Sequence, residues 1–404
     1  MLTRYLGLIS LSICFGTALI GQTFAEDSIK IGVALELSGR FVSFGSHCKR
    51  GVEMASDAFG PTVLGKKIEF LYRDMQSDTQ ATVSSFTALV TQDNVNYIIG
   101  PIASSIAAAA IPPWRQGKPL WMMPGASTET FETEVGKEPQ FFHTFPYAYH
   151  YYTSLSGALK HYLGAGKTMA IIYVDDEYGR THIQFARKYF TDAGFKIIDE
   201  ELIRANSPDM NPVLTKISRL KPDVLLGITQ TTDAITLAKQ AFTRRLAVPY
   251  LVGTSAIQLS EWAAAVGEAQ EGWIGLSTYL PGAENWPANS RNPKLFPSTK
   301  DWEQKFETTY HQKPDYYDAL CYVNAGLLLT AIEKAGVDDR LKVAAQMRSI
   351  DMQTPYGKAK FVPTASGTTQ QAFADMLVFQ KQNGNNVVLY PLAAATGKLE
   401  APKK

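Results

Sequence analysis

The sequence predicts an α/β fold with two lobes, each built around a doubly wound parallel sheet. The chain of 404 residues is long enough for two domains with separate cores. Short apolar β-branched segments alternate with longer segments of helical periodicity, and the alternation forms two successive runs of similar size. In such sheets ligands bind beyond the carboxyl ends of the strands, so two facing lobes would share one cleft.

The first run predicts three strands and two helices. Segment 67–73 illustrates the strand pattern, because Ile68, Phe70 and Tyr72 would share one face of the sheet. The other strands are expected at 29–37 and 97–99, and the helices at 48–59 and 81–91.

A second run begins near Tyr147. One of its helices has a clear start, where Asn211 can serve as N-cap and Pro212 as the first helical residue. Further strands are expected at 168–174, 224–228, 250–252, 376–380 and 386–390, further helices at 178–193, 257–266 and 317–334, and a long loop at 282–297.

The first 25 residues are expected to be a cleaved secretory signal peptide. Arg4 supplies the positive start, 6–20 form a short apolar stretch, and Thr23-Phe24-Ala25 resembles a cleavage site. A transmembrane anchor is the alternative, but the apolar stretch is short for a span. The mature protein would begin at Glu26 and be exported.

Charge and cysteine content limit the partners. The formal net charge is +1, and loss of Arg4 with the leader brings it to zero, which argues against a nucleic-acid partner. No other apolar run is long enough to cross a bilayer, so the mature chain is not expected to span a membrane. Cys48 and Cys321 could form a disulfide or could be two small buried residues, and the sequence leaves both open.

No motif in the sequence predicts catalysis. Segment 60–67, GPTVLGKK, approaches a phosphate-binding loop, but Lys67 replaces the required Ser or Thr and the segment precedes a strand. His143, His150 and His161 have no Cys, Asp or Glu at metal-ligand spacing beside them. Residues 175–177 (Asp-Asp-Glu) are better explained by the start of the next helix. We therefore expect no enzyme activity, no catalytic residue, no metal and no cofactor.

Short motifs along almost the whole mature chain resemble one family. They are Leu37-Ser38-Gly39 with Phe44-Gly45 and Gly51, Gly100–Ser105, Pro124–Thr128, Phe142–Pro146, Asp176–Gly179, Lys221-Pro222-Asp223, and Pro355–Lys358 with Phe361. Their order and spacing, behind a secretory leader, are similar to the leucine/isoleucine/valine-binding family. These are type I periplasmic solute-binding proteins of branched-chain amino acid ABC transporters.

The resemblance implies discontinuous lobes and a mechanism. The chain would cross between the lobes three times, forming a hinge, and closure would bury a small-molecule ligand. The closed form would dock on an inner-membrane ABC permease. The implied division is 1–25 signal peptide, 27–145 plus 280–354 lobe 1, 146–279 plus 355–392 lobe 2, and 393–404 tail.

The resemblance also implies the ligand-binding residues of lobe 1. Ser104 matches the family residue that holds the ligand's carboxylate, and Ser105 stands beside it at the same helix start. Ala126 matches a residue that offers backbone groups, and Thr128, next to Ser127, matches one that offers a hydroxyl. Phe44 from lobe 1 and Tyr178 from lobe 2 match aromatic walls.

The match is loosest in lobe 2, where Gln230, Thr231 and Ser255 are the remaining expected ligand-binding residues. The amino-acid receptors of the family pair the ligand's ammonium with an acidic residue, and that position is Ser255 here. Since a desolvated ammonium without a counter-charge is costly, we expect a carboxylate- or amide-bearing ligand without an α-ammonium. Phe44, Tyr147 and Tyr178 favour an aromatic or short organic acid, with a branched-chain amino acid next.

Two other functions stay open. A ligand-sensing receptor of the same fold would have the same cleft and would report to a signalling partner, and a neighbouring sensor-kinase gene would indicate it. An exported hydrolase would need a nucleophile or metal, and turnover of a substrate panel would reveal it.

Overall fold

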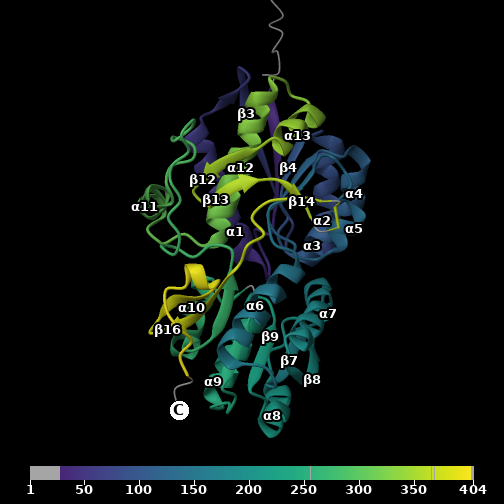
Figure 1. The fold of residues 1–404 in the computed structure, drawn as a ribbon. Helices are drawn as coiled ribbons and strands as arrows, with labels where there is room; N and C mark the ends of the chain where they lie inside the picture. Colours follow the sequence, from purple (N-terminus) through teal and green to yellow (C-terminus); the bar gives the residue numbers. More distant parts are fainter. Residues whose placement is uncertain (1–27, 255, 365, 368, 402–404) are drawn as a thin grey trace, which may run out of the picture.

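The computed structural model describes residues 28–254, 256–364, 366–367 and 369–401. The predicted signal peptide (1–25) and the predicted ligand-binding residue Ser255 lie outside these ranges. The described chain forms two α/β lobes, each with its own large sheet (Figure 1). The predicted fold class is confirmed.

The first lobe contains an eight-stranded sheet. Its order is β14-β15-β6-β5-β4-β1-β3-β2. Neighbours from β15 to β3 run parallel, and only the outermost pairs, β14–β15 and β3–β2, are antiparallel. The strands are β1 (Ser28–Leu35), β2 (Thr62–Val63), β3 (Lys66–Asp74), β4 (Tyr97–Ile99), β5 (Leu120–Met123), β6 (Phe141–His143), β14 (Val362–Pro363) and β15 (Gln370–Gln371).

Helices pack around this sheet, and two of them are joined covalently. A disulfide links Cys48 on α1 to Cys321 on α12, which settles the pairing that the sequence left open. At Gly51 an added Cβ would lie 2.3 Å from the backbone oxygen of Asp318, so glycine permits the close approach of these two helices. The helices are α1 (Val42–Phe59), α2 (Thr79–Thr87) continued by the π-helical turn Ala88–Gln92, α3 (Ser104–Ala109), α4 (Ile111–Gly117), α5 (Thr130–Glu134), α11 (Thr299–Tyr310), α12 (Tyr316–Ala335) and α13 (Arg340–Arg348), followed by a hairpin of β12 (Asp351–Thr354) and β13 (Gly357–Lys360).

The second lobe contains a seven-stranded sheet in the order β17-β16-β11-β10-β9-β7-β8. It is parallel from β8 to β11, and β16 and β17 extend it as an antiparallel hairpin. Its strands are β7 (Thr168–Val174), β8 (Lys196–Ile203), β9 (Val224–Ile228), β10 (Tyr250–Gly253), β11 (Ile274–Ser277), β16 (Leu377–Gln382) and β17 (Asn385–Tyr390). Its α-helices are α6 (Ala148–Leu163), α7 (Glu177–Asp192), α8 (Asn211–Leu220), α9 (Thr231–Thr243) and α10 (Ser260–Val266), with 3₁₀ turns at Gly267–Gln270 and Leu392–Ala394.

The chain passes between the two sheets three times among the described residues: after β6, after β11 and after β15. The last passage lies later than predicted. Residues 355–392 were assigned to lobe 2, but β14 and β15, within that range, belong to the first sheet. Strand β15 runs parallel to β6, and Gln371 Nε2 also donates to the carbonyl of Phe145 at 2.7 Å. Strands β15 and β6 are far apart in the chain, so local sequence patterns do not predict their pairing.

Two helix starts also differ from prediction. Met210 rather than Asn211 occupies the N-cap of α8, and Asn211 is already helical. The helix expected from residue 257 begins at Ser260, because the preceding residues form turns. Within the described ranges no single helix has the length and apolarity for crossing a bilayer. The bent pair α12 and α13 together would be long and apolar enough, by length and composition alone.

Candidate functional site

Direct contacts join the carboxyl ends of the two parallel sheets. Arg40 follows β1 in the first lobe, and its guanidinium forms a 2.9 Å ion pair with Asp176, which follows β7 in the second. Thr128, past the end of β5, donates from Oγ1 to Glu177 at 2.9 Å and lies 3.0 Å from the hydroxyl of Thr181. These contacts define the lobe boundary, and they place the predicted ligand-binding edges of the two sheets opposite each other.

His182, on α7, contacts residues of both lobes at this boundary. Its Nε2 lies 2.7 Å from Ser127 Oγ of the first lobe, and its Nδ1 lies 3.0 Å from the hydroxyl of Tyr152. The ring of Tyr178 packs over it at 3.9 Å between centroids. Burial lowers the pKa of His182 to about 3, so the imidazole is neutral. A neutral imidazole with one donor and one acceptor matches two hydroxyl partners.

Ala126 stands in the left-handed region, with φ of +57°. Its N–H donates to the carbonyl of Ile102 at 2.6 Å, and Nε2 of His143 lies 2.9 Å and 3.1 Å from the carbonyls of Gly125 and Ala126. Burial lowers the pKa of His143 to about 4, which leaves a neutral ring that donates from Nε2. The predicted backbone groups of Ala126 are therefore held in place by two neighbouring segments.

The segment before α3 contacts an acid that the sequence did not reveal. Glu36, fully buried after β1, accepts hydrogen bonds from the N–H groups of Ile102 at 3.1 Å and Ala103 at 2.9 Å. Burial raises the pKa of Glu36 to about 7. The neighbouring Ser104 is buried, and the Ser105 hydroxyl is buried without a hydrogen-bond partner among the described residues. The available signal was a carboxylate placed directly after the first strand.

The predicted aromatic walls are both buried. Phe44 packs edge-on against Tyr317, with ring centroids 5.4 Å apart, and Phe145 stacks on Tyr317 with ring centroids 5.7 Å apart. Tyr178 belongs to the second lobe and contacts His182 instead. Tyr317 was not predicted as a site residue, because it lies within a long apolar helix whose pattern indicates only core packing.

In the second lobe, two of the predicted site residues lie at the start of α9. Gln230 is its N-cap residue and is buried, and Thr231 follows with a buried hydroxyl that has no partner in the described chain. Asp233 accepts from the N–H of Ser207 at 3.1 Å, and burial raises its pKa to about 6. The charge of Arg40 in the first lobe acts on Asp233, so the start of α9 lies near the lobe boundary. Ser255 lies outside the described residues.

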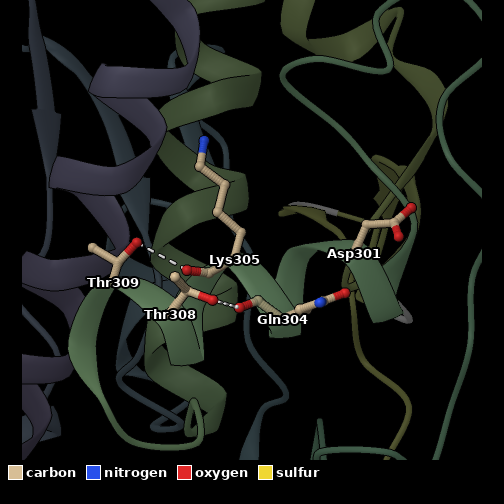
Figure 2. A pocket seen from close by; sticks show the side chains of 5 residues that line it. All are labelled: Asp301, Gln304, Lys305, Thr308 and Thr309. Atoms are coloured by element: carbon tan, nitrogen blue, oxygen red, sulfur yellow. Dashed lines mark hydrogen bonds between the residues drawn. The ribbon is translucent and has the colours of Figure 1, made fainter.

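A shallow hollow of about 330 Å³ lies elsewhere, along the exposed face of α11 (Figure 2). Its five lining residues are Asp301, Gln304, Lys305, Thr308 and Thr309. The hydroxyls of Thr308 and Thr309 donate back to the carbonyls of Gln304 and Lys305 in their own helix. The hollow therefore has no converging set of groups such as a ligand site needs.

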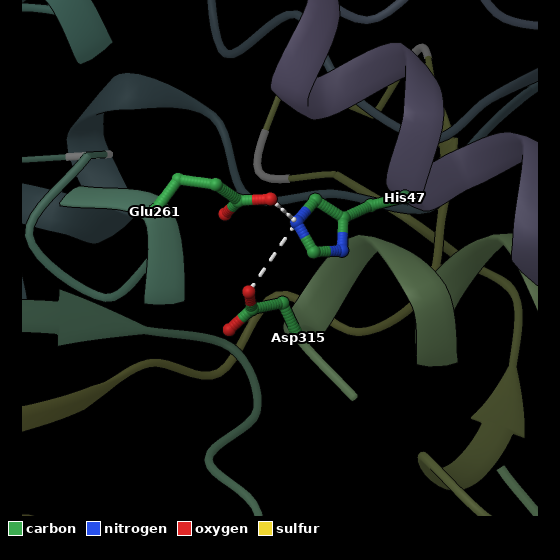
Figure 3. A group of neighbouring side chains, drawn as sticks. All are labelled: His47, Glu261 and Asp315. Atoms are coloured by element: carbon green, nitrogen blue, oxygen red, sulfur yellow. Dashed lines mark hydrogen bonds and ion pairs between the residues drawn. The ribbon is translucent and has the colours of Figure 1, made fainter. Parts of the chain in front are cut away.

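A second histidine at the lobe boundary has charged partners. His47, on α1, directs Nδ1 to Asp318 at 2.5 Å and Nε2 to Glu261 at 2.8 Å and Asp315 at 3.3 Å (Figure 3 draws His47, Glu261 and Asp315). Arg50 also contacts Asp318, at 2.9 Å. We call these five residues the His47 cluster. The sequence pattern does not reveal this cluster, because more than 200 positions separate His47 from its carboxylates.

Comparisons with known proteins agree with this architecture. Residues 28–386 match the periplasmic binding protein family. The chain is 24% identical over 408 aligned residues to Leu/Ile/Val-binding protein homolog 7 of Brucella suis, an alignment that covers 98% of this chain and 99% of the relative.

Solved structures show the same fold. A solute-binding protein from R. palustris in complex with benzoate aligns with a TM-score of 0.78 at 21% identity, over 90% of this chain and 96% of that one. A branched-chain amino acid transporter substrate-binding protein from Streptococcus pneumoniae, in complex with isoleucine, aligns with a TM-score of 0.77 at 19% identity, over 93% and 100%. With two wound lobes, three passages between them and a family match over most of its length, the chain belongs to the periplasmic binding protein family.

Proposed function

We propose that this protein is the exported substrate-binding component of an ABC importer and that it clamps a small solute at the lobe boundary. One observation carries the proposal. Ser105 from the first lobe and Thr231 from the second each present a buried hydroxyl that has no partner among the described residues, and each follows the end of a strand. Buried polar groups are normally hydrogen-bonded, so these two call for a ligand between the lobes.

The proposed ligand carries a carboxylate or amide and lacks an α-ammonium. The resemblance places Ser255 where amino-acid receptors have an acid. Two other buried acids, Glu36 and Asp233, already accept backbone N–H groups, so neither is a free counter-charge. An unpaired ammonium would therefore be costly to bury.

An aromatic or short organic acid suits the surroundings best. Phe44 and Tyr178 supply apolar ring surface, one from each lobe. The structural relative from R. palustris holds benzoate, which supports this choice, and the one from Streptococcus pneumoniae holds isoleucine, which supports the branched-chain alternative.

Closure links binding to transport in this proposal. The lobes would comprise 27–145 plus 280–371 and 146–279 plus 372–392, which amends the sequence-based division at the last passage. The solute would stabilise the closed arrangement, and an inner-membrane permease would recognise that arrangement in the periplasm.

A thermal-shift screen of residues 26–404 tests the ligand class. The panel holds benzoate, the branched-chain keto acids, branched-chain amino acids, and urea with small amides. A bound solute at a hundredfold excess over its Kd stabilises the folded form by about 2.7 kcal/mol and raises Tm. We expect acids without an ammonium to raise Tm, whereas a strong shift with leucine or isoleucine would overturn the proposed ligand class.

Isothermal titration of two variants tests the site. Ser105→Ala and Thr231→Val should each weaken the best solute, while Thr133→Val should leave its affinity unchanged, because the Thr133 hydroxyl bonds only to its own helix at the carbonyl of Thr130. Unchanged affinity in both site variants would place the solute elsewhere.

A further inference from the structure

The His47 cluster joins side chains of the first lobe to one side chain of the second lobe. His47 lies on α1, and Asp315 and Asp318 lie at the start of α12, all in the first lobe. Glu261 lies on α10 of the second lobe. The imidazole and Asp318 are fully buried, whereas 44% of the Glu261 side chain is exposed, so the cluster reaches solvent at Glu261.

The position of Asp318 directs the Nε2 lone pair of His47 at two carboxylates. Nδ1 lies 2.5 Å from Asp318 Oδ2 and also 2.5 Å from Nη2 of Arg50, which itself contacts Asp318. With the ring proton on Nδ1, the Asp318 carboxylate accepts it and the Nε2 lone pair is free. Nε2 then faces Glu261 Oε1 at 2.8 Å and Asp315 Oδ2 at 3.3 Å. A lone pair against two carboxylate oxygens is repulsive, so this point requires a cation: a proton or a metal ion.

The local charge favours a divalent ion. The cluster contains three carboxylates. Among the described residues Arg50 is its only guanidinium, and it pairs with Asp318 at 2.9 Å. With a neutral His47 the group carries two excess negative charges, which one divalent ion neutralises and one proton does not. Lys381, on β16, acts on Asp315 only at longer range. Buried excess charge is costly, so the site gains from the doubly charged ion.

We propose that His47 Nε2, Glu261 and Asp315 bind a divalent transition-metal ion that ties the two lobes together. Imidazole and carboxylates are ligands that zinc accepts at about 2.0–2.2 Å, which places tetrahedral ligand atoms about 3.3 Å apart. The observed separations of 2.8 Å and 3.3 Å from Nε2 therefore need only a small adjustment. Water reaches the fourth position past the half-exposed Glu261.

The surroundings already orient the ligands. Asp318 holds the imidazole from behind, and Ser260 donates to Asp315 Oδ2 from its backbone N–H at 3.1 Å and from its hydroxyl at 2.6 Å. Such outer contacts accompany functional metal ligands. The sequence predicted no metal, because its spacing could not bring together residues from three separate helices.

Isothermal titration of zinc into the untagged mature protein, freed of metal with EDTA, tests the site. We expect one ion per chain, and Glu261→Gln should weaken binding at least about tenfold. This variant keeps the size of a half-exposed side chain, so the fold should survive, and circular dichroism checks that it does. Glu268→Gln, an exposed change in the turn after α10, is the matched control and should bind as the wild type does.

Zinc-edge anomalous scattering from crystals locates the ion. Density beside His47 Nε2 confirms the site. Density only at the exposed His161 or His311 overturns it, as do the absence of saturable binding and equal affinity of the wild type and Glu261→Gln. Absent zinc binding, with a Tm that depends on pH, would mean that Nε2 holds only a proton.

Discussion

Two buried histidines lie at the lobe boundary, and their surroundings shift their pKa values in opposite directions. His182 is surrounded by hydroxyls and an aromatic ring, and burial lowers its pKa to about 3. Burial also lowers the pKa of His47, but the hydrogen bonds to Asp318 and Glu261 outweigh this and raise it to about 10. Burial alone therefore does not determine the charge of a histidine, because the partners decide it.

The two regions consequently hold the lobes together by different physics. The His182 region relies on neutral hydrogen bonds, each worth about 1 kcal/mol. The His47 cluster relies on attraction between opposite charges. Burying these charges costs free energy, and their attraction offsets that cost only while every partner is present. We expect the charged region to be sensitive to single substitutions and the neutral region to be tolerant.

The largest effect is expected from Asp318→Asn. This change removes the counter-charge of both His47 and Arg50 and weakens the capping box of α12. Breaking a buried ion pair on one side costs about 3–5 kcal/mol, and urea denaturation should show this loss in the free energy of unfolding. Asp57→Asn, exposed on α1, is the control and should change it by less than about 0.5 kcal/mol. A loss below about 1 kcal/mol for Asp318→Asn would show that the cluster is not held by charge.

The second largest effect on stability is expected from removing the disulfide beside the His47 cluster. Cys48 and Cys321 join α1 to α12 across 273 positions of sequence, whereas the described His182 region has no covalent link. Replacing both cysteines with alanine should lower the free energy of unfolding by about 2–4 kcal/mol, mainly by freeing the unfolded chain. Urea denaturation measures this, with the wild type under reducing conditions as the comparison. Equal stability of the oxidised wild type and the double variant would contradict it.

The sequence predicted the features that depend on local residue patterns, namely most strands and helices and the division into two lobes. Strand and helix alternation identified both lobes, since apolar periodicity follows from burial of one face. It left the pairing of Cys48 with Cys321 open and missed Glu36 and His47, because their partners come from distant segments. The assignment of 355–371 to the second lobe failed for the same reason: β15 takes its place by pairing with β6, not by its own composition.

A pH series separates the two histidines on the acid side. The folded pKa of His182 is depressed below 6.5, so its contribution to stability is present above pH 6.5 and is lost as pH falls towards 3. Each pH unit below 6.5 should cost about 1.4 kcal/mol through this residue. His182→Gln should flatten the dependence between pH 6.5 and pH 5 in urea denaturation with EDTA present. An unchanged slope in the variant would assign the dependence to other groups.

On the alkaline side the sign reverses. The folded pKa of His47 is raised, so its contribution is fully present below pH 6.5 and is lost as pH rises towards 10. In EDTA the wild type should therefore lose stability between pH 7 and pH 9, while Glu261→Gln, which removes one partner of the imidazolium, should lose less. A steeper loss in Glu261→Gln would contradict the assignment.

The smallest effect concerns the neutral region and its role in closure. Thr128 bonds across the boundary to the Glu177 carboxylate and the Thr181 hydroxyl, so Thr128→Val removes two hydrogen bonds that are made only when the lobes meet. A loss of about 1 kcal/mol in the closed state should weaken the best solute about fivefold and leave the unfolding of each lobe nearly unchanged. Isothermal titration measures the affinity. If Thr128→Val instead lowered stability as much as Asp318→Asn, the boundary would be one cooperative unit, and the contrast between its charged and neutral regions would not hold.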